Sequence, residues 1–113
     1  MVKLVILIEP QENVRLFEEN WPQFLHYAEE MPGLVREATS QVEATLFGRS
    51  YQMMHELFFA SRQDAEGAMS SPTGQAAGRL LQQITGGNLT LFFADYKEDD
   101  IENIRKYKSV SGE

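Results

Sequence analysis

The chain lacks cysteine entirely, and this absence removes several kinds of chemistry at once. Disulfide bonds, thiolate metal sites and cysteine nucleophiles all require that side chain. No stretch approaches the roughly 20 apolar residues of a membrane-spanning helix, and the N-terminus has neither a basic leader nor a small-residue cleavage site. We therefore expect a single cytoplasmic domain of 113 residues without a membrane partner.

Positive charge is also scarce. Ten Lys and Arg residues stand against 17 Asp and Glu residues, which gives a formal net charge of -7. This charge repels phosphate backbones, and the chain has no basic patch, glycine-rich phosphate loop or base-stacking motif to offset it. The sequence predicts no nucleic-acid partner.

Apolar residues at strand spacing are abundant. In residues 2–8, 53–60 and 89–94, both of the alternating faces that a strand would present are largely apolar. A half-exposed strand alternates apolar with polar residues, whereas a strand buried on both sides need not. These segments therefore predict strands that are covered by protein on both faces.

The order of elements predicts the fold class. We expect strands at 2–9, 34–47, 51–60 and 88–96, a helical stretch at 13–31, and helices at 61–70 and 71–86. Pro22 either kinks the first helical stretch or follows a break, after which Asn20 would cap a second helix. This order is the ferredoxin-like βαββαβ arrangement, an α+β fold with a four-stranded antiparallel sheet and its helices on one face.

The prediction that the strands are covered on both faces bears on how the chain assembles. The helices of such a domain cover only one face of the sheet, so a second layer of protein must cover the other. Another copy of the chain is the simplest source of that layer. We therefore expect a homodimer through the sheet face, which closes into a dimeric α+β barrel and buries more than roughly 1,200 Å².

Several sequence pieces resemble one known family over nearly the whole chain. They are the first strand Met1-Val2-Lys3-Leu4-Val5, then Met31-Pro32-Gly33-Leu34, the stretch 55–61 (HELFFAS), Ser71-Pro72-Thr73-Gly74, and Gly86-Gly87. Their order and spacing are similar to the EthD-like members of the dimeric α+β barrel superfamily. The resemblance implies a small homodimer with a pocket between sheet and helices. It implies an EthD-like ferredoxin-fold domain over 1–97, followed by a charged C-terminal extension over 98–113, where Ile101, Ile104 and Tyr107 have helical spacing.

The chain departs from the family pattern late in the first helix. Family members often carry a histidine followed by Pro-Leu-Ala there. When the sequences are aligned through Pro32-Gly33, Phe24 stands at the histidine position and His26 at the proline position. His26 could replace the family histidine only if the helix register shifted by about half a turn.

Two titratable residues on the third strand are the main catalytic candidates. His55 and Glu56 are adjacent, so their side chains point to opposite faces. Whichever side chain faces a pocket is a desolvated acid–base group with a shifted pKa. Structural alternatives stand beside these roles: His55 as a hydrogen-bonded core histidine, and Glu56 as a carboxylate paired at the dimer interface.

Further candidates lie on and near the first helix. His26 precedes Glu29 and Glu30 by three and four residues, but one histidine and two acids supply too few metal ligands, so no metal site is predicted. Its alternative reading is a solvated helix flank. Four aromatic residues are candidates for lining a substrate pocket or for the core: Trp21, Phe24, Tyr27 and Tyr51.

Two functional classes follow. The first is a small-molecule-binding protein that acts as an enzyme without a built-in cofactor, by proton transfer, isomerisation or monooxygenation of an apolar or aromatic ligand. The second is a non-catalytic ligand-binding or assembly module on the same dimer. A closed cavity larger than roughly 300 Å³ with His55 or Glu56 in its wall favours the enzyme.

Overall fold

A computed structural model describes residues 1–99 and 101. The elements are β1 (Val2–Ile8), α1 (Val14–Glu29), β2 (Leu34–Gln41), β3 (Met53–Phe59), α2 (Arg62–Ser70), α3 (Pro72–Thr85) and β4 (Leu89–Asp95). Ile104 and Tyr107, which the sequence placed on a helical face of the C-terminal extension, lie outside the described residues.

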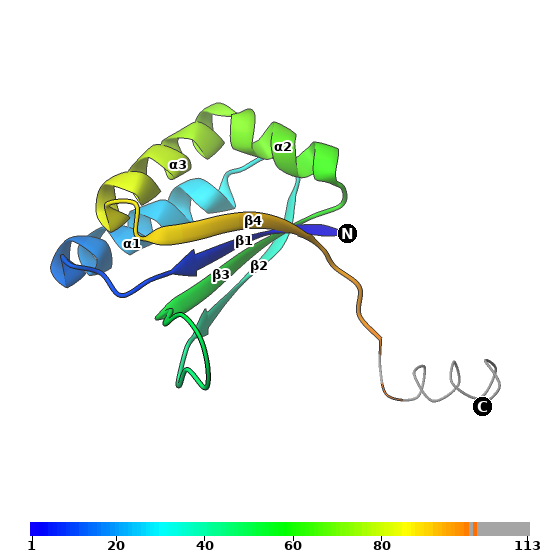
Figure 1. Cartoon of the computed structure of the whole chain (residues 1–113). Helices are drawn as coiled ribbons and strands as arrows, with labels where there is room; N and C mark the ends of the chain where they lie inside the picture. The colour runs from blue at the N-terminus through cyan, green and yellow to red at the C-terminus, as the bar shows by residue number, and fades with distance from the viewer. Residues whose placement is uncertain (100, 102–113) are drawn as a thin grey trace.

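The four strands form one antiparallel sheet in the order β2-β3-β1-β4. Helices α1, α2 and α3 pack on one face of this sheet (Figure 1). Within residues 1–99 and 101, no helix or strand covers the opposite face, here called the far face. The predicted ferredoxin-like βαββαβ class is therefore confirmed. The connection between β3 and β4 contains two helices, α2 and α3, as the two predicted N-caps indicated.

The hydrophobic core lies between the sheet and the helices. In the register of β1, Ile6 stands opposite His55 on one side and Leu91 on the other, so these side chains share the helix-facing side. The strands supply Leu4, Ile6, Ile8, Met53, Leu57 and Phe59 to the core, and the helices supply Phe17, Phe24, Ala28, Ala65, Ala68, Ala77, Leu81 and Ile84.

Helix α1 is continuous from Val14 to Glu29 and includes Pro22. Its first turn is capped because the Asn13 side chain accepts a hydrogen bond from the Leu16 amide at 3.0 Å. The alternative with Asn20 as the cap of a separate helix is wrong, because Asn20 lies inside α1 and its side-chain Nδ2 donates to the Leu16 carbonyl at 2.9 Å within the same helix.

The connection between β2 and β3 differs from the expectation. The strand predicted over 34–47 ends at Gln41, and β3 begins at Met53. Residues 42–52, here called the arm, leave the sheet on the side opposite the helices (Figure 1). The alternating sequence of 42–47 has strand character, but only one backbone bond, from the Val42 amide to the Gln52 carbonyl at 3.0 Å, closes the base of the arm.

Serine caps and a close glycine contact position α2 and α3. Ser61 accepts a hydrogen bond from the Asp64 amide, and Ser71 accepts one from the Gly74 amide, both at 3.1 Å. At Gly74 a Cβ atom would lie 2.1 Å from the Ala68 carbonyl oxygen. Only glycine lets the two helices approach this closely.

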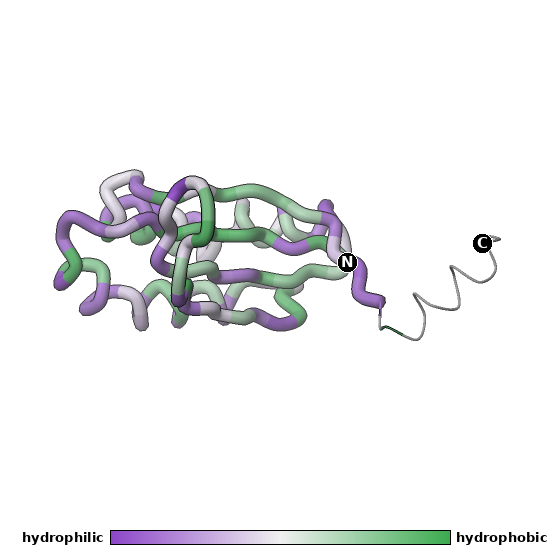
Figure 2. Tube along the Cα trace, turned by 60° about the horizontal axis from the view of Figure 1, so that its bottom comes forward, coloured by the Kyte–Doolittle hydropathy of each residue, from purple (hydrophilic) through white to green (hydrophobic). Residues whose placement is uncertain are grey.

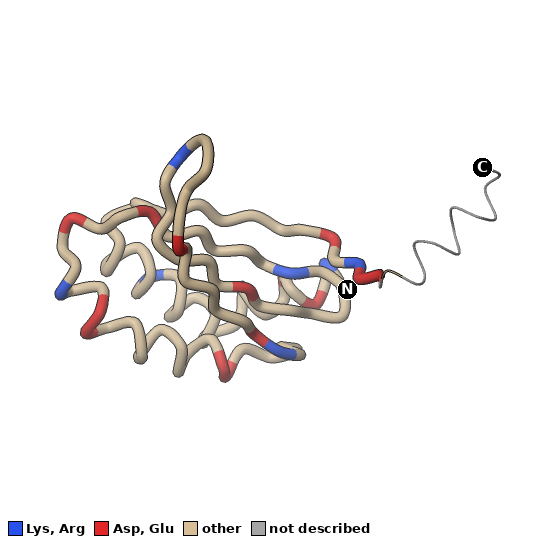
Figure 3. The backbone as a smooth tube through the Cα atoms, turned by 90° about the horizontal axis from the view of Figure 1, so that it is seen from below, with Lys and Arg blue, Asp and Glu red and all other residues tan. Residues whose placement is uncertain are grey.

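The far face of the sheet is largely uncharged. Much of the sheet is hydrophobic along its strands, whereas the helices mix hydrophobic and hydrophilic residues (Figure 2). Seen from the far-face side, few charged residues interrupt the strands (Figure 3). Among residues 1–99 and 101, no helix is both long and apolar enough to cross a membrane.

Candidate functional site

A buried histidine links two polar residues of the neighbouring strand. His55 on β3 has 1% of its side chain exposed. Its Nδ1 lies 2.8 Å from Thr39 Oγ1, and its Nε2 lies 3.0 Å from Glu37 Oε2. Thr39 is exposed and Glu37 is partly buried, so this Glu37–His55–Thr39 cluster reaches from the core to the surface along β2.

The two hydrogen-bond partners of His55 determine which nitrogen of its ring carries the proton. An ionised carboxylate can only accept hydrogen bonds, so His55 Nε2–H donates to Glu37. In the neutral imidazole Nδ1 is then an acceptor, and the Thr39 hydroxyl donates to it. Both nitrogens are satisfied, which explains why a polar ring is stable in this part of the core.

Aromatic side chains of α1 cover the imidazole. Trp21 stacks between Phe17 and Phe24, with ring centroids 5.2 and 4.9 Å apart. Trp21 and Phe24 both meet His55 edge-on, with centroid distances of 5.3 and 6.0 Å. These contacts arise because the apolar positions of α1 recur every three or four residues and form one stripe over the sheet.

Burial sets the charge state of this histidine. Desolvation beneath the aromatic cover lowers the pKa of His55 from its ordinary value of 6.5, while the hydrogen bond and the charge of Glu37 oppose this shift. Glu56 also raises the pKa, by a smaller amount. The imidazole is therefore neutral near pH 7, and a proton that enters the cluster is shared by the Glu37–His55 pair.

A cavity of about 260 Å³ lies between the first half of α1 and the adjoining ends of β2 and β3. Trp21 and Gln41 line it together with Phe17, Glu18, Pro22, Gln52 and Met53. Trp21 separates this cavity from the imidazole, and Gln41 lies two residues beyond Thr39 on the same face of β2. Glu37, Thr39 and His55 do not line this cavity themselves.

Neither His55 nor Glu56 lines this cavity, so it does not match the pocket wall that the sequence led us to expect. Two further cavities also exclude both residues. One of about 550 Å³ lies between α3 and β4, and one of about 210 Å³ lies near the start of α1. The polar contacts of His55 are its hydrogen bonds to Glu37 and Thr39, which are more exposed than the imidazole.

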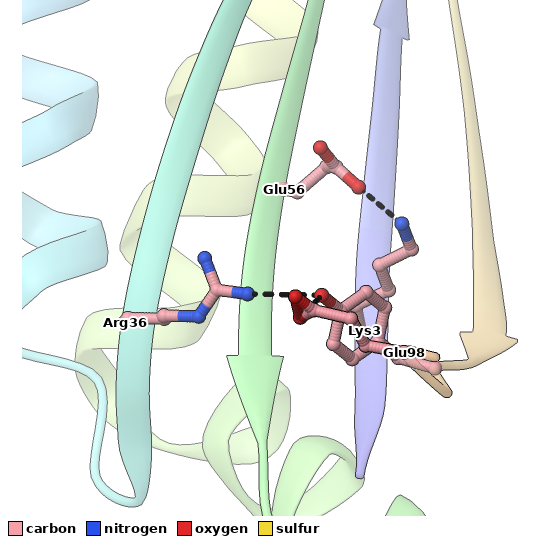
Figure 4. A network of polar contacts seen from close by, with 5 residues as sticks. Lys3, Arg36, Glu56 and Glu98 are labelled. Atoms are coloured by element: carbon pink, nitrogen blue, oxygen red, sulfur yellow. Dashed lines mark hydrogen bonds and ion pairs between the residues drawn. The ribbon is translucent and has the colours of Figure 1, made fainter. Parts of the chain in front are cut away.

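Glu56 lies on the far face, away from His55. Its carboxylate is paired with Lys3 Nζ from β1 (Figure 4). Beside this pair the guanidinium of Arg36 stacks over the Phe58 ring at 3.8 Å and donates a 3.5 Å hydrogen bond to the Tyr96 hydroxyl. Glu56 thus belongs to a far-face polar network, in keeping with its alternative reading as an interface carboxylate.

A tyrosine completes this network. The Tyr96 hydroxyl donates a 2.6 Å hydrogen bond to Glu98, and this bond raises the pKa of Tyr96. The Tyr96 ring also meets Phe58 edge-on, with ring centroids 5.1 Å apart. The far face therefore carries one polar and aromatic cluster at the end of the sheet where β4 finishes.

The remaining sequence candidates lie apart from the cluster. His26 is on the exposed side of α1, with 62% of its side chain accessible and Nε2 lying 3.3 Å from Glu30. Tyr27 is partly buried against the core, and Tyr51 is half-buried immediately before β3. Within the described residues, no three potential ligands gather as a metal site would require.

Sequence reasoning missed Glu37 and Thr39. A bulge between Leu34 and Arg36 inserts one extra residue in β2, so the helix-facing positions change from even to odd numbers. Thr39 then stands opposite His55, and Glu37 opposite Leu57. Glu37 and Thr39 are two residues apart on a predicted strand, so their side chains lie on the same face. This spacing was the feature of the sequence that could have indicated the pair.

Comparisons with known proteins support the EthD-like resemblance through structure. An EthD family protein from Bacillus halodurans is 25% identical, covers 86% of this chain and 99% of its own, and has a TM-score of 0.78. A dimeric ferredoxin-like protein of unknown function from Jannaschia is 18% identical over 84% of this chain and 98% of its own, with a TM-score of 0.65. No family model and no curated protein matches the sequence.

A third solved structure has the same fold. It is a proposed antibiotic biosynthesis monooxygenase from Caulobacter crescentus, 15% identical over 86% of this chain and 90% of its own, with a TM-score of 0.58. At this identity the likeness shows the fold alone. The chain thus resembles an EthD family protein and shares its fold with proteins described as dimeric ferredoxin-like.

Proposed function

We propose that this chain is a homodimeric small-molecule-binding protein and that the Glu37–His55–Thr39 cluster transfers protons to and from an apolar or aromatic ligand. One observation carries the proposal: a buried neutral imidazole is held between a carboxylate and a hydroxyl that both reach the surface beside an aromatic wall. A fixed tautomer and a shifted pKa are typical of residues that transfer protons in enzymes.

The proton route follows from the hydrogen bonds. A ligand that extends from the cavity beside Trp21 along β2 would meet the Thr39 hydroxyl and then the Glu37 carboxylate, which do not line the cavity themselves. The Oε2 atom of Glu37 is engaged by His55. The other carboxylate oxygen, Oε1, can accept a proton from the ligand. His55 holds the carboxylate in place and, as its partner in the pair, shares that proton. The chemistry needs no cofactor.

The departure from the family pattern fits this assignment. The resemblance implies a histidine where this chain has Phe24, and the Phe24 ring lies against the imidazole of His55. We therefore assign to His55, on the sheet, the imidazole that related proteins carry on the helix. His26 and Glu56 have no part in this proposed proton transfer, because one is exposed on α1 and the other lies on the far face.

The assembly proposed is a pair of sheets packed through their far faces. Three apolar residues of that face, Leu7, Met54 and Phe92, are incompletely buried in the single chain, and structurally similar proteins are described as dimeric. A second sheet about 10 Å away would bury them. We further propose a cytoplasmic location, with neither nucleic acid nor membrane as partner.

A non-catalytic ligand-binding role is the second candidate. It is favoured by the cavity of about 260 Å³, which Trp21 closes off from His55. In this case the cluster would orient the ligand by hydrogen bonds and transfer no proton. The two candidates differ in one measurable property, the exchange of ligand protons with solvent.

The test uses phenylacetone, an aromatic ketone with weakly acidic carbon-bound protons. The protein is incubated with phenylacetone in D2O, and deuterium incorporation is followed by NMR. We expect the wild type to accelerate exchange, Glu37→Gln to lose at least about 100-fold of that acceleration, and Glu56→Gln to retain it. Equal acceleration by the wild type and Glu37→Gln would contradict the catalytic role. Binding without exchange would favour the second candidate.

A further inference from the structure

The tip of the arm carries two large apolar side chains with almost no contact to the rest of the chain. Leu46 is 96% exposed and Phe47 is 98% exposed. Single exposed apolar residues are common on protein surfaces. The adjacent Leu46 and Phe47 instead form an exposed apolar patch at the end of a projecting segment, and such patches mark sites of interaction with another surface.

The arm points toward the space that a second copy would occupy. It leaves the sheet on the far-face side, opposite the helices (Figure 1). The sheet therefore lies between the arm and the helices of its own chain. A neighbouring chain packed on the far face would be within reach of the arm.

An apolar groove on the helix side of the molecule has no occupant within the described chain. It has a volume of about 550 Å³ and lies between α3 and the edge strand β4. Apolar and small residues dominate its lining: Met69, Gly74, Gly78, Leu81, Leu89 and Leu91. Leu91 is 46% exposed, so the groove is apolar and open at the sheet edge.

The sheet register brings the arm and the groove to the same end of the molecule. Gln41, the last residue of β2, lies level with Met53, Ile8 and Leu89 across the four strands. If the far faces pack about a two-fold axis parallel to the strands, the β2 edge of one copy lies beside the β4 edge of the other. The arm, which continues β2, then starts at the rim of the other copy's groove.

The arm and the groove carry opposite charges. The arm carries Glu43, and the groove is lined by Arg79. Within residues 1–99 and 101, neither side chain forms an ion pair in the single chain. An exchanged arm would bring these opposite charges together at the edge of the groove.

We propose that the Leu46–Phe47 tip of one copy packs into the α3–β4 groove of a second copy of this chain, and that the two arms are exchanged reciprocally. The inference rests on the proposed homodimer, because it requires the far faces to meet. It adds a second contact region, formed by the arm and the groove, to the sheet-to-sheet interface.

The absence of native cysteine allows a direct crosslinking test. Phe47→Cys and Gly78→Cys are purified separately, mixed under reducing conditions so that subunits exchange, and then oxidised. A Cβ at Gly78 meets no neighbour within 4 Å, so a cysteine fits there. We expect a disulfide-linked heterodimer of the two variants. Gly67→Cys on α2, where a Cβ is equally unobstructed, is the matched control and should not link to Phe47→Cys.

A second experiment replaces the two apolar side chains at the tip of the arm. Leu46→Ser/Phe47→Ser should raise the dimer dissociation constant, measured by analytical ultracentrifugation, by at least about 100-fold, since two large apolar side chains per subunit are lost from the interface. The control Val14→Ser/Leu16→Ser removes two exposed apolar side chains from α1 and should leave the constant within about threefold.

Several outcomes overturn the proposal. If the wild type is a dimer but Phe47→Cys links to neither partner or equally to Gly67→Cys and Gly78→Cys, the exchanged arm is wrong and the sheet-to-sheet dimer stands. If Phe47→Cys subunits form disulfides mainly with one another, the exchanged arm is also wrong and the sheet-to-sheet dimer stands. A wild type that stays monomeric at micromolar concentration overturns both the arm exchange and the homodimer.

Discussion

His55 and Glu56 are neighbours in sequence, but their side chains lie on opposite faces of the sheet and belong to different polar clusters. His55 bonds to Glu37 and Thr39 beneath α1, whereas Glu56 pairs with Lys3 on the far face. Strand geometry imposes this separation, since adjacent residues of a strand point in opposite directions. The two residues therefore have separate roles, which the predictions below distinguish.

The first prediction concerns the pH dependence of stability. Burial lowers the pKa of His55 from 6.5, so below pH 6.5 the unfolded chain binds a proton that the folded chain resists. The free energy of unfolding should fall as the pH drops below about 6.5, by up to about 1.4 kcal/mol per pH unit, until the lowered pKa is reached. Urea unfolding between pH 5.5 and 7.5 measures this slope.

Two variants serve as controls for that slope. His55→Gln removes the titrating ring and should flatten the dependence over this pH range. His26→Gln changes an exposed histidine and should leave the slope as in the wild type. A slope that disappears in His26→Gln and persists in His55→Gln would show that burial of His55 is not its origin.

The second prediction concerns the hydroxyl of the cluster. Thr39→Val keeps the shape of the side chain but removes the hydrogen bond to His55 Nδ1. The loss should cost about 1–2 kcal/mol of unfolding free energy, because the imidazole nitrogen is left without a partner in the core. Thr45→Val, in the arm, is the matched control and should change stability by less than about 0.5 kcal/mol. Equal effects of the two variants would exclude a special role for Thr39.

The third prediction concerns Lys3 and Glu56. If the far faces meet in a dimer, Glu56→Ala leaves the Lys3 ammonium without its partner in a dry interface. Dimer formation should weaken by about 3–5 kcal/mol, the usual result of breaking a buried pair. The double variant Lys3→Met/Glu56→Leu replaces both charges by apolar groups and should recover most of the affinity in sedimentation equilibrium. If the double variant were as weak as the single one, the pair would not be desolvated by assembly.

The fourth prediction concerns two glycines of α3. Gly74→Ala places a methyl group against the Ala68 carbonyl, so the helices must separate, at a cost of about 1–3 kcal/mol. Gly78→Ala adds a methyl group in open space and should stabilise the helix by up to about 1 kcal/mol. Thermal or urea unfolding gives both values. A tolerated Gly74→Ala would mean that α2 and α3 do not pack as closely as described.

The fold could be predicted from the sequence because its signals are local and repeated. Apolar periodicity located the strands and helices to within two residues, except that β2 ends six residues before the end of the predicted strand. Ser61, Ser71 and Gly86 marked helix ends through capping. The arm was mistaken for strand because its residues alternate like a strand. Pairing with a neighbour, which local sequence does not reveal, decides whether such a segment joins a sheet.

The candidate site could be predicted only in part. His55 and the aromatic cover Trp21 and Phe24 were selected from the sequence, and the opposite directions of His55 and Glu56 follow from strand geometry. Glu37 and Thr39 were not selected, because the bulge at the start of β2 reverses which residues face the helices. Long-range register of this kind depends on how two strands meet rather than on either strand alone.

The central claim is that a neutral His55, held by Glu37 and Thr39, lies beside the bound ligand. The chain has two histidines, so protein labelled with 15N-histidine gives two imidazole signal sets in a long-range 1H–15N NMR spectrum. At pH 7 the account predicts that His55 is the neutral Nε2–H tautomer, and that phenylacetone shifts its signals but not those of His26. A protonated or Nδ1–H ring for His55, or ligand saturation that leaves its signals unchanged, would contradict the account.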